Sequence, residues 1–167
     1  ALTELKPNPF VRDYPLSPDE VTSEFLTKCL GAEVISFECD TSMIDGGVLA
    51  DSFRVSITYN SDGDAAGKPA SVFLKCTKRI EGIVTLSTST ATYQKEIYFY
   101  EHLHQQVRPG VRVPECLGVF YNPADPDRSE FCIVLEEFTE DEFACYDQTK
   151  APMSLADIGP FLDDLAR

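Results

Sequence analysis

The sequence contains no tryptophan, only two methionines and two histidines, and no run of apolar residues that could cross a membrane. A membrane-spanning helix needs about 20 consecutive apolar residues, so we expect no membrane span. Lysine and arginine are also scarce, with 14 of them against 28 acidic residues and a formal charge of −14. Because a phosphate backbone is bound by concentrated positive charge, this scarcity predicts that nucleic acid is not a partner.

The cysteines are scattered along the chain, and no C-x-x-C pair is present. Most of them lie within apolar runs, which is typical of small buried hydrophobic residues rather than of zinc ligands or a disulfide framework. We therefore expect a reducing compartment, which is the cytoplasm, or an organelle interior if a targeting segment was removed before Ala1. The residues present show no signal-peptide pattern.

A chain of 167 residues with 43% apolar side chains is long enough for one domain with a core. The segment 17–20 (SPDE) supplies an N-cap, a proline at the first helical position and a capping-box glutamate. This pattern predicts a helix that continues to Leu30 and ends at Gly31. Residues 1–16, with prolines at three positions, are expected to form an extended arm.

Alternating apolar and polar residues, bounded by turn-rich segments, predict five β-strands. The clearest run is 52–59, in which Phe53, Val55, Ile57 and Tyr59 face one way. The first three strands are expected to form an antiparallel meander, and the last two a hairpin. The predicted strands are 34–39, 52–59, 71–76, 116–121 and 130–138.

A helix is predicted over residues 91–107, between the third and fourth strands, after a segment rich in serine and threonine. Its apolar stripe consists of Tyr93, Ile97, Tyr100, Leu103 and Val107. Glu96 lies on the same stripe, whereas His102 and His104 are expected to be surface or half-buried helix residues and not zinc ligands. A last helix begins at Ser154 or at Gly159-Pro160 and runs to Arg167. The whole pattern predicts an α+β fold built on a five-stranded antiparallel sheet with one inserted helix.

Lys75 ends the third strand, and Glu96 is a carboxylate on an apolar helix stripe. A carboxylate is costly to bury without a cation, so the sequence predicts that Lys75 and Glu96 form an internal ion pair. Taken alone, a lysine at a strand end is most often a solvated surface residue. The helix carboxylate is what favours the internal pair.

The order of these elements resembles the amino-terminal lobe of the kinase-like fold, over about residues 20–167. The closer similarity is to the group of aminoglycoside phosphotransferases and choline-kinase-like proteins, including the ecdysteroid-kinase-like branch, rather than to protein kinases. The resemblance implies that Lys75, fixed by Glu96, contacts the α- and β-phosphates of ATP. It also implies that residues 17–138 form this lobe, and that 139–167 are the hinge and the beginning of a second, missing lobe.

Further site residues follow from the same resemblance. Gly46 and Gly47 stand where the family has its nucleotide-covering loop, although two adjacent glycines fit an ordinary hairpin turn equally well. The fifth strand leads into the hinge, where the main-chain groups of Glu136 and Phe138 would recognise adenine. The alternative reading is an edge strand with a polar end. Phe73 is a departure, because protein kinases keep a small alanine at this place.

The chemistry of phosphoryl transfer needs a catalytic-loop Asp and further Mg²⁺ ligands. The family supplies them as H-G-D-x-x-x-x-N and a later D-x-E or D-F-G-like segment, and neither motif occurs in this sequence. We therefore expect no catalytic residue and no metal ligand here, although the resemblance implies ATP and Mg²⁺ as cofactors. The chain is interpreted as the nucleotide-binding lobe of an ATP-dependent phosphotransferase acting on a small hydroxylated molecule, inactive alone. The alternative is a non-catalytic kinase-like scaffold that contacts a protein partner through the acidic region Glu136–Asp147.

Overall fold

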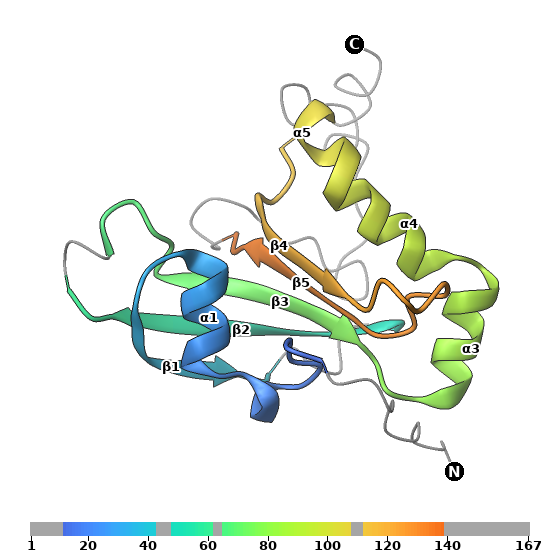
Figure 1. Ribbon diagram of the computed structural model, residues 1–167, viewed down its shortest axis with the longest axis horizontal. Coiled ribbons are helices and arrows are strands. Elements are labelled where there is room, and N and C mark those ends of the chain that lie inside the picture. The colour runs from blue at the N-terminus through green and yellow to red at the C-terminus, as the bar shows by residue number, and fades with distance from the viewer. Residues whose placement is uncertain (1–11, 43–47, 62–64, 108–111, 139–167) are drawn as a thin grey trace, which may run out of the picture.

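Five antiparallel strands form a single sheet in the computed structural model, which describes residues 12–42, 48–61, 65–107 and 112–138 (Figure 1). Along the sheet the strands lie in the order β1-β2-β3-β5-β4. The predicted α+β class, the antiparallel sheet and all five strand positions are confirmed. The strands are β1 (Val34–Asp40), β2 (Ala50–Tyr59), β3 (Ser71–Thr77), β4 (Cys116–Tyr121) and β5 (Phe131–Glu136).

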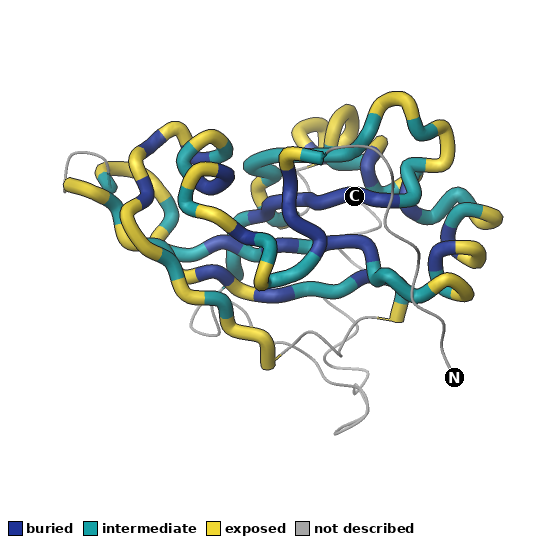
Figure 2. Tube along the Cα trace, turned by 60° about the horizontal axis from the view of Figure 1, so that its bottom comes forward, coloured by how far each residue is buried: buried dark blue, intermediate teal, exposed yellow. Residues whose placement is uncertain are grey.

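The sheet joins two sequence-local pieces through one long-range pairing. β1, β2 and β3 form the predicted meander, and β4 and β5 form the predicted hairpin. β3 then pairs with β5, with Val72 opposite Glu136 and Cys76 opposite Cys132. This pairing places β3 and β5 in the interior of the sheet, and Figure 2 shows the buried segments concentrated in these central strands.

Each face of the sheet carries its own hydrophobic cluster, because successive side chains of a strand point to opposite faces. On one face, buried side chains of β2, β3 and β5 pack against the helix α1 (Ser23–Leu30), and we call this the α1-side cluster. On the other face, Phe131, Ile133 and Leu135 pack against Val84, Tyr93 and Ile97 of the later helices. The sheet is therefore a middle layer between two helical layers.

The first helix begins later than the sequence pattern predicts. Pro18–Glu20 forms only a 3-10 turn, and the Ser17 side chain makes no capping hydrogen bond. Val21 is extended and buried, and the Thr22 hydroxyl accepts a hydrogen bond from the Phe25 amide at 3.1 Å. Thr22 is thus the N-cap of α1, because it places a side-chain acceptor at an unpaired amide of the first turn.

The end of α1 lies where the sequence predicts it. Gly31 takes the left-handed conformation at φ 64°, and its amide donates to the Thr27 carbonyl at 2.9 Å. Glycine adopts this conformation without the steric cost that a Cβ atom brings, so it ends the helix at low cost.

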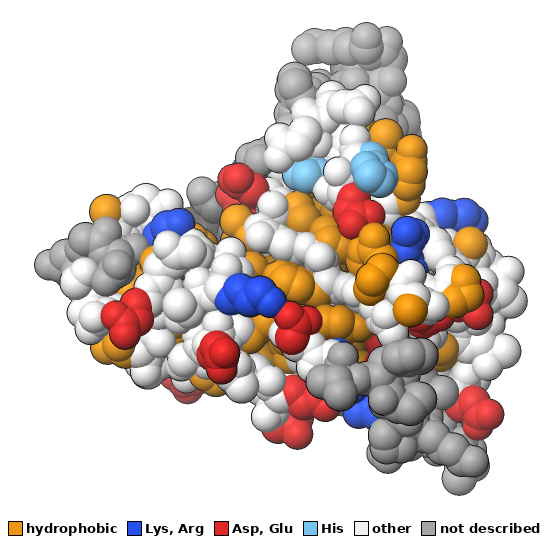
Figure 3. Space-filling model, in the orientation of Figure 1, with side chains coloured by type: hydrophobic (Ala, Val, Ile, Leu, Met, Phe, Trp, Pro, Cys, Tyr) orange, Lys and Arg blue, Asp and Glu red, His pale blue; other side chains and the backbone are white. Residues whose placement is uncertain are grey.

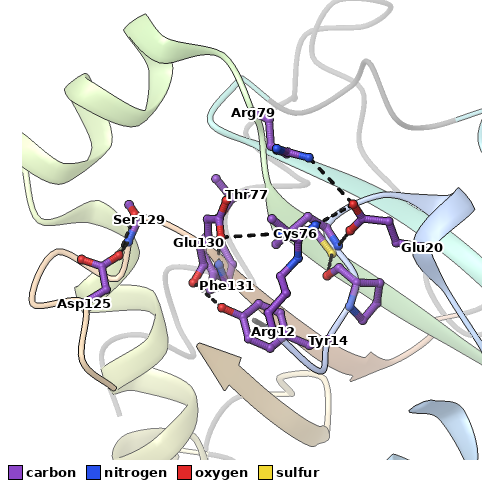
Figure 4. Close-up of polar contacts among 12 residues, drawn as sticks. Arg12, Tyr14, Glu20, Cys76, Thr77, Arg79, Asp125, Ser129, Glu130 and Phe131 are labelled. Carbon is purple, nitrogen blue, oxygen red and sulfur yellow. Dashed lines mark hydrogen bonds and ion pairs between the residues drawn. The ribbon is translucent and has the colours of Figure 1, made fainter. Parts of the chain in front are cut away.

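The end of the expected N-terminal arm belongs to the core. Tyr14 and Leu16 are buried in the α1-side cluster, and the Tyr14 hydroxyl donates to the Glu130 carbonyl at 3.2 Å. Arg12 pairs with Glu20 at 2.5 Å, and its guanidinium also lies 3.9 Å from the buried Glu130 carboxylate. Figure 4 shows Arg12, Tyr14, Glu20 and Glu130 close to one another. The core therefore extends at least to Tyr14, whereas residues 1–11 lie outside the described part of the chain.

The serine- and threonine-rich segment before the second predicted helix is itself helical. It forms α3 (Glu81–Ser89), which the sequence interpretation missed. β-Branched and hydroxyl residues have low helix propensity, which hides such a helix from pattern reading. Here the hydroxyls bond back into the helix, as when Thr90 Oγ1 donates to the Leu86 carbonyl at 2.9 Å.

The predicted helix 91–107 is three successive pieces. Ala91 is left-handed at φ 53° and separates α3 from α4 (Thr92–Tyr98). A π-helical stretch, Phe99–Leu103, follows and leads into α5 (His104–Val107). The buried stripe therefore ends at His104, 7% exposed, whereas Leu103 and Val107 are each 37% exposed. The expectation that His104 is a surface or half-buried residue is wrong, because it is buried. The expectation that Leu103 and Val107 belong to the buried stripe is wrong as well.

Three predicted features lie outside the described residues. They are the Gly46-Gly47 pair, the acidic segment from residue 139 onward, and the last helix near 154–167. Within the described part of the chain, no helix combines the length and apolar character that crossing a bilayer requires.

Tyr14 gives a test of how firmly the N-terminal segment is held. Burial, reinforced by the nearby Glu130 carboxylate, raises the pKa of Tyr14 to about 12. Because the folded pKa exceeds the unfolded value, this stabilisation is complete below about pH 10 and is lost as the pH rises through about 12. Tyr14→Phe should lower the free energy of unfolding by about 1 kcal/mol at neutral pH, since the Glu130 carbonyl loses its donor.

The measurement is urea unfolding followed by circular dichroism from neutral to strongly alkaline pH. The stability difference between wild type and Tyr14→Phe should shrink as the pH rises, because only the wild type loses the contribution of a neutral Tyr14. Tyr98→Phe, at a side chain that is 52% exposed, is the matched control and should change neither quantity. An unchanged pH dependence in Tyr14→Phe would contradict this account.

Candidate functional site

Lys75 lies on the sheet face that packs against α3 and α4. Along β3 the buried residues Val72, Leu74 and Cys76 belong to the α1-side cluster, so Phe73 and Lys75 point to the opposite face. The strand register places Ser52, Lys75 and Ile133 in one row across β2, β3 and β5. The lysine is therefore in the centre of the sheet, where its backbone is fixed by a strand on each side.

Glu96 comes from α4 and meets Lys75 directly. The Lys75 Nζ atom lies 2.5 Å from Glu96 Oε1, a charge-assisted hydrogen bond. Tyr93 and Ile97 of the same helix are buried against the sheet, and this packing fixes the position of α4. The Lys75 and Glu96 side chains are 31% and 22% exposed. The predicted ion pair is confirmed, and it is half-buried at the edge of the core.

Two tyrosines flank the Glu96 carboxylate and respond to its charge. Burial, together with this negative charge, raises the pKa of Tyr100 to about 12. Burial also raises the pKa of Tyr93, with Asp51 and Glu96 acting in the same direction. The Tyr93 hydroxyl donates to the Leu49 carbonyl at 2.8 Å, just before β2 begins. Both phenols therefore stay neutral donors at physiological pH beside the ion pair.

A second cation lies on the Lys75 face, and the sequence interpretation did not single it out. Arg54 is opposite Phe73 in the next row of the sheet. Its Nε atom lies 2.9 Å from Glu137 Oε1, and Glu137 also accepts a hydrogen bond from Ser71. The only sequence signal for Arg54 was its place on the polar side of the alternating strand 52–59. Lys75 and Arg54 thus give this face two positive groups, each paired with one carboxylate.

The predicted hinge residues Glu136 and Phe138 come together around Arg112. The Arg112 guanidinium donates to both carboxylate oxygens of Glu136, at 3.0 and 2.7 Å, and lies 4.8 Å from the centre of the Phe138 ring. Glu136 also accepts from the Glu115 amide at 2.9 Å, and its own amide donates to the Glu115 carbonyl at 2.8 Å. The carboxylate and amide of Glu136 are therefore engaged, and the end of β5 is braced against the segment before β4.

Distance along the strands separates the two parts of the candidate site. Lys75 is opposite Ile133, and Glu136 lies three residues further along β5. At about 3.3 Å per residue, this is roughly 10 Å along the sheet. Phe73 lies between the two parts and packs against the cluster that contains Leu135. The site is thus a strip of the sheet face with a cation at one end and the β5 terminus at the other.

No group of three or more His, Cys, Asp or Glu side chains arranged to hold a metal occurs among the described residues. A surface cleft of about 760 Å³ lies elsewhere, lined by the N-terminal segment and α1. Its two cations are already paired, Arg12 with Glu20 and Lys28 with Asp13. Neither Lys75 nor Glu96 lines this cleft, so the cleft is separate from the candidate site. Figure 3 shows charged side chains of both signs interspersed over the face it displays, without a concentrated patch of either sign.

Comparisons with known proteins gave no match among protein-family models, curated proteins or solved structures. The candidate site is therefore supported by the sequence and by its geometry. The predicted roles of Gly46 and Gly47 lie outside the described residues, and the nucleotide-binding roles of Lys75, Glu96, Glu136 and Phe138 stay predictions.

The Lys75–Glu96 pair can be tested with a double-mutant cycle of Lys75→Met and Glu96→Gln. Each single substitution should destabilise the chain, because it leaves the other half-buried charge without its partner. The coupling energy should be about 1 kcal/mol, at the upper end of the range for exposed pairs. Urea unfolding of the wild type, both single variants and the double variant measures it.

The matched control is the Lys28–Asp13 pair, which has a similar separation of 2.6 Å but side chains that are 64% and 72% exposed. Water screens that pair, so the same cycle at Lys28 and Asp13 should give no measurable coupling. Equal coupling in the two cycles would contradict a special environment for Lys75 and Glu96.

Proposed function

We propose that this chain is the nucleotide-binding lobe of an ATP-dependent phosphotransferase that acts on a small hydroxylated molecule. The observation that carries the proposal is the ion pair between Lys75 of a central strand and Glu96 of the following helix, 2.5 Å apart. A lysine held by an internal carboxylate is the arrangement by which kinase-like proteins present a cation to nucleotide phosphates. The sequence resemblance to the aminoglycoside phosphotransferase and choline-kinase-like group points to the same function.

The position of the pair within the fold supports this proposal. β3 carries Lys75, and the helical segment that carries Glu96 is inserted between β3 and β4. β5 lies beside β3 in the sheet and is the last strand along the chain. This is the order of elements that the resemblance implies for a kinase-like lobe. The braced end of β5, with Glu136 and Phe138 held by Arg112, is the proposed place for the base.

The charges of the sheet face fit an anionic ligand. Lys75 and Arg54 lie on one face, and each has one carboxylate partner rather than several. Phosphate oxygens bound there would gain charge-assisted hydrogen bonds from the two cations. Phe73, which lies opposite Arg54 and two residues from Lys75 along β3, offers a flat apolar surface. It makes the base position narrower than the alanine of protein kinases would.

The proposal assigns binding rather than transfer to these residues. Lys75 would position the phosphates, while the Mg²⁺ ligands and the acceptor-orienting Asp belong to motifs that this sequence does not contain. Mg²⁺, when bound with the nucleotide, would neutralise part of the phosphate charge. The chain alone is therefore expected to bind nucleotide weakly and to show no turnover.

A displacement titration with a fluorescent ATP analogue tests the proposal. The wild-type chain should give a fluorescence change that unlabelled ATP reverses. Lys75→Met should weaken binding by about ten- to a hundredfold, because it removes one hydrogen-bonded charge worth roughly 1.5–3 kcal/mol. Circular dichroism of each variant confirms that the fold is retained.

The matched control is Lys95→Met, which removes an exposed lysine next to Glu96 whose Nζ atom bonds only locally, to the Thr90 carbonyl at 3.0 Å. Its affinity for the analogue should equal that of the wild type. The proposal would be refuted by a signal that ATP does not displace, or by equal losses in Lys75→Met and Lys95→Met.

A further inference from the structure

Two cysteines face each other across the central pairing of the sheet. Cys76 of β3 is the direct register partner of Cys132 of β5. Residues directly opposite in an antiparallel pair have Cα atoms about 4.5–5.5 Å apart, which falls within the roughly 4.4–6.8 Å range of disulfides. Both side chains belong to the α1-side cluster, so they project from the same face of the sheet. The backbone thus already has the separation and direction that a disulfide needs.

The two thiols are also in contact with one another and shielded from water. Both residues have 0% exposure, and the side chain of Cys132 is in hydrogen-bonding contact with that of Cys76. Burial, followed by this contact, raises the pKa of Cys132 well above its ordinary value. The Cys76 thiol donates to the Pro15 carbonyl at 3.5 Å. In the folded protein, both thiols are therefore shielded from reagents in the solvent.

The other cysteines in the described ranges lack such a partner in the sheet register. Cys39 is opposite Val55 and Cys116 is opposite Leu135, while Cys29 lies on α1. The described cysteines are all present as thiols. Among the cysteines of the described strands, the sheet register therefore singles out one pair.

We propose that Cys76 and Cys132 are a modification site that forms a cross-strand disulfide when the chain folds in the presence of a small disulfide oxidant such as oxidised glutathione. One cysteine thiolate attacks the oxidant, forming a mixed disulfide and releasing one glutathione thiol. The second cysteine then attacks the protein sulfur of the mixed disulfide and releases the other glutathione thiol. The two cysteines are oxidised, the oxidant is reduced, and the two protons end on the two glutathione molecules.

Burial sets the conditions for this reaction. Folded, reduced protein should resist the oxidant, because both thiols are buried and inaccessible to it. The bond should form while β3 and β5 assemble, or when they separate transiently. Once formed, it would link the strand that carries Lys75 to its long-range neighbour. The inference does not depend on the proposed nucleotide site.

Oxidative refolding tests the proposal. The chain is unfolded in urea with reductant, then refolded in a mixture of reduced and oxidised glutathione, and remaining thiols are blocked with N-ethylmaleimide. Mass spectrometry of a digest made without reduction should show Cys76 linked to Cys132 as the most abundant linkage, with the loss of two hydrogens per molecule. Thermal unfolding should shift to higher temperature relative to the reduced protein, because the link constrains the unfolded chain.

Two further measurements make the outcome decisive. Folded, reduced protein in the same oxidant should stay unlinked, and linkage should appear when sub-denaturing urea is added. Cys132→Ala should abolish the linkage, whereas Cys39→Ala, at a half-buried cysteine that lies opposite Val55 and not opposite another cysteine, should leave it unchanged. Recovery of Cys76 and Cys132 as blocked thiols in correctly refolded protein would overturn the proposal, as would a linkage spread over other cysteines. Both outcomes can be read on the unsubstituted chain, even if Cys132→Ala fails to fold.

Discussion

The pairing of β3 with β5 is the interaction on which the rest of the structure depends. It is the contact that converts a meander and a hairpin into one sheet, and it joins segments that are distant in the sequence. Such pairing is costly to form, because a long loop must close before the contacts stabilise it. Its stability comes from burial on both faces, since every residue from Phe131 to Leu135 is buried. The sheet is thus stable at its centre, where two independent apolar clusters meet.

The same pairing explains how a half-buried charge is tolerated. Lys75 belongs to the interior of the sheet, but its side chain stays 31% exposed on the face that packs against α4. Glu96 reaches it from a helix anchored by Tyr93 and Ile97, so that the carboxylate is placed by packing and not by its own attraction. An ion pair positioned in this way loses little side-chain freedom when it forms. Two further ion pairs, Arg54 with Glu137 and Arg112 with Glu136, lie at or just after the end of β5.

Most of the sheet could be predicted from the sequence, because alternation along 52–59 and 71–76 is a local signal with a period that only a strand satisfies. The Lys75–Glu96 pair could be predicted as well, since a carboxylate on an apolar stripe demands a cation. The helix α3 could not, because Thr85, Ser87 and Thr88 have low helix propensity. A compensating bond, such as the one from the Thr88 hydroxyl to the Thr85 carbonyl, exists only once the helix has formed. The Arg112–Glu136 contact was equally hidden, since it joins the irregular segment before β4 to the end of β5.

The start of α1 shows why helix boundaries are less predictable than helices. Ser17 and Thr22 both offer an N-cap hydroxyl, and the capping-box pattern favours Ser17. Burial of Val21 in an extended conformation decides for Thr22, and this burial is a property of the assembled core. Glu20, expected as part of the capping box, instead accepts from the Leu16 amide at 2.8 Å and pairs with Arg12.

The π-helical segment Phe99–Leu103 determines which of the side chains after it are buried and which are exposed. A π-helical turn contains one residue more than an α-helical turn, and each residue rotates a helix by about 100°. Deleting a single residue there would therefore turn the imidazole of His104 away from the protein interior and bring a neighbour inward. The number of residues in this segment is therefore fixed, because an insertion or deletion of one residue would change which side chain is buried after it.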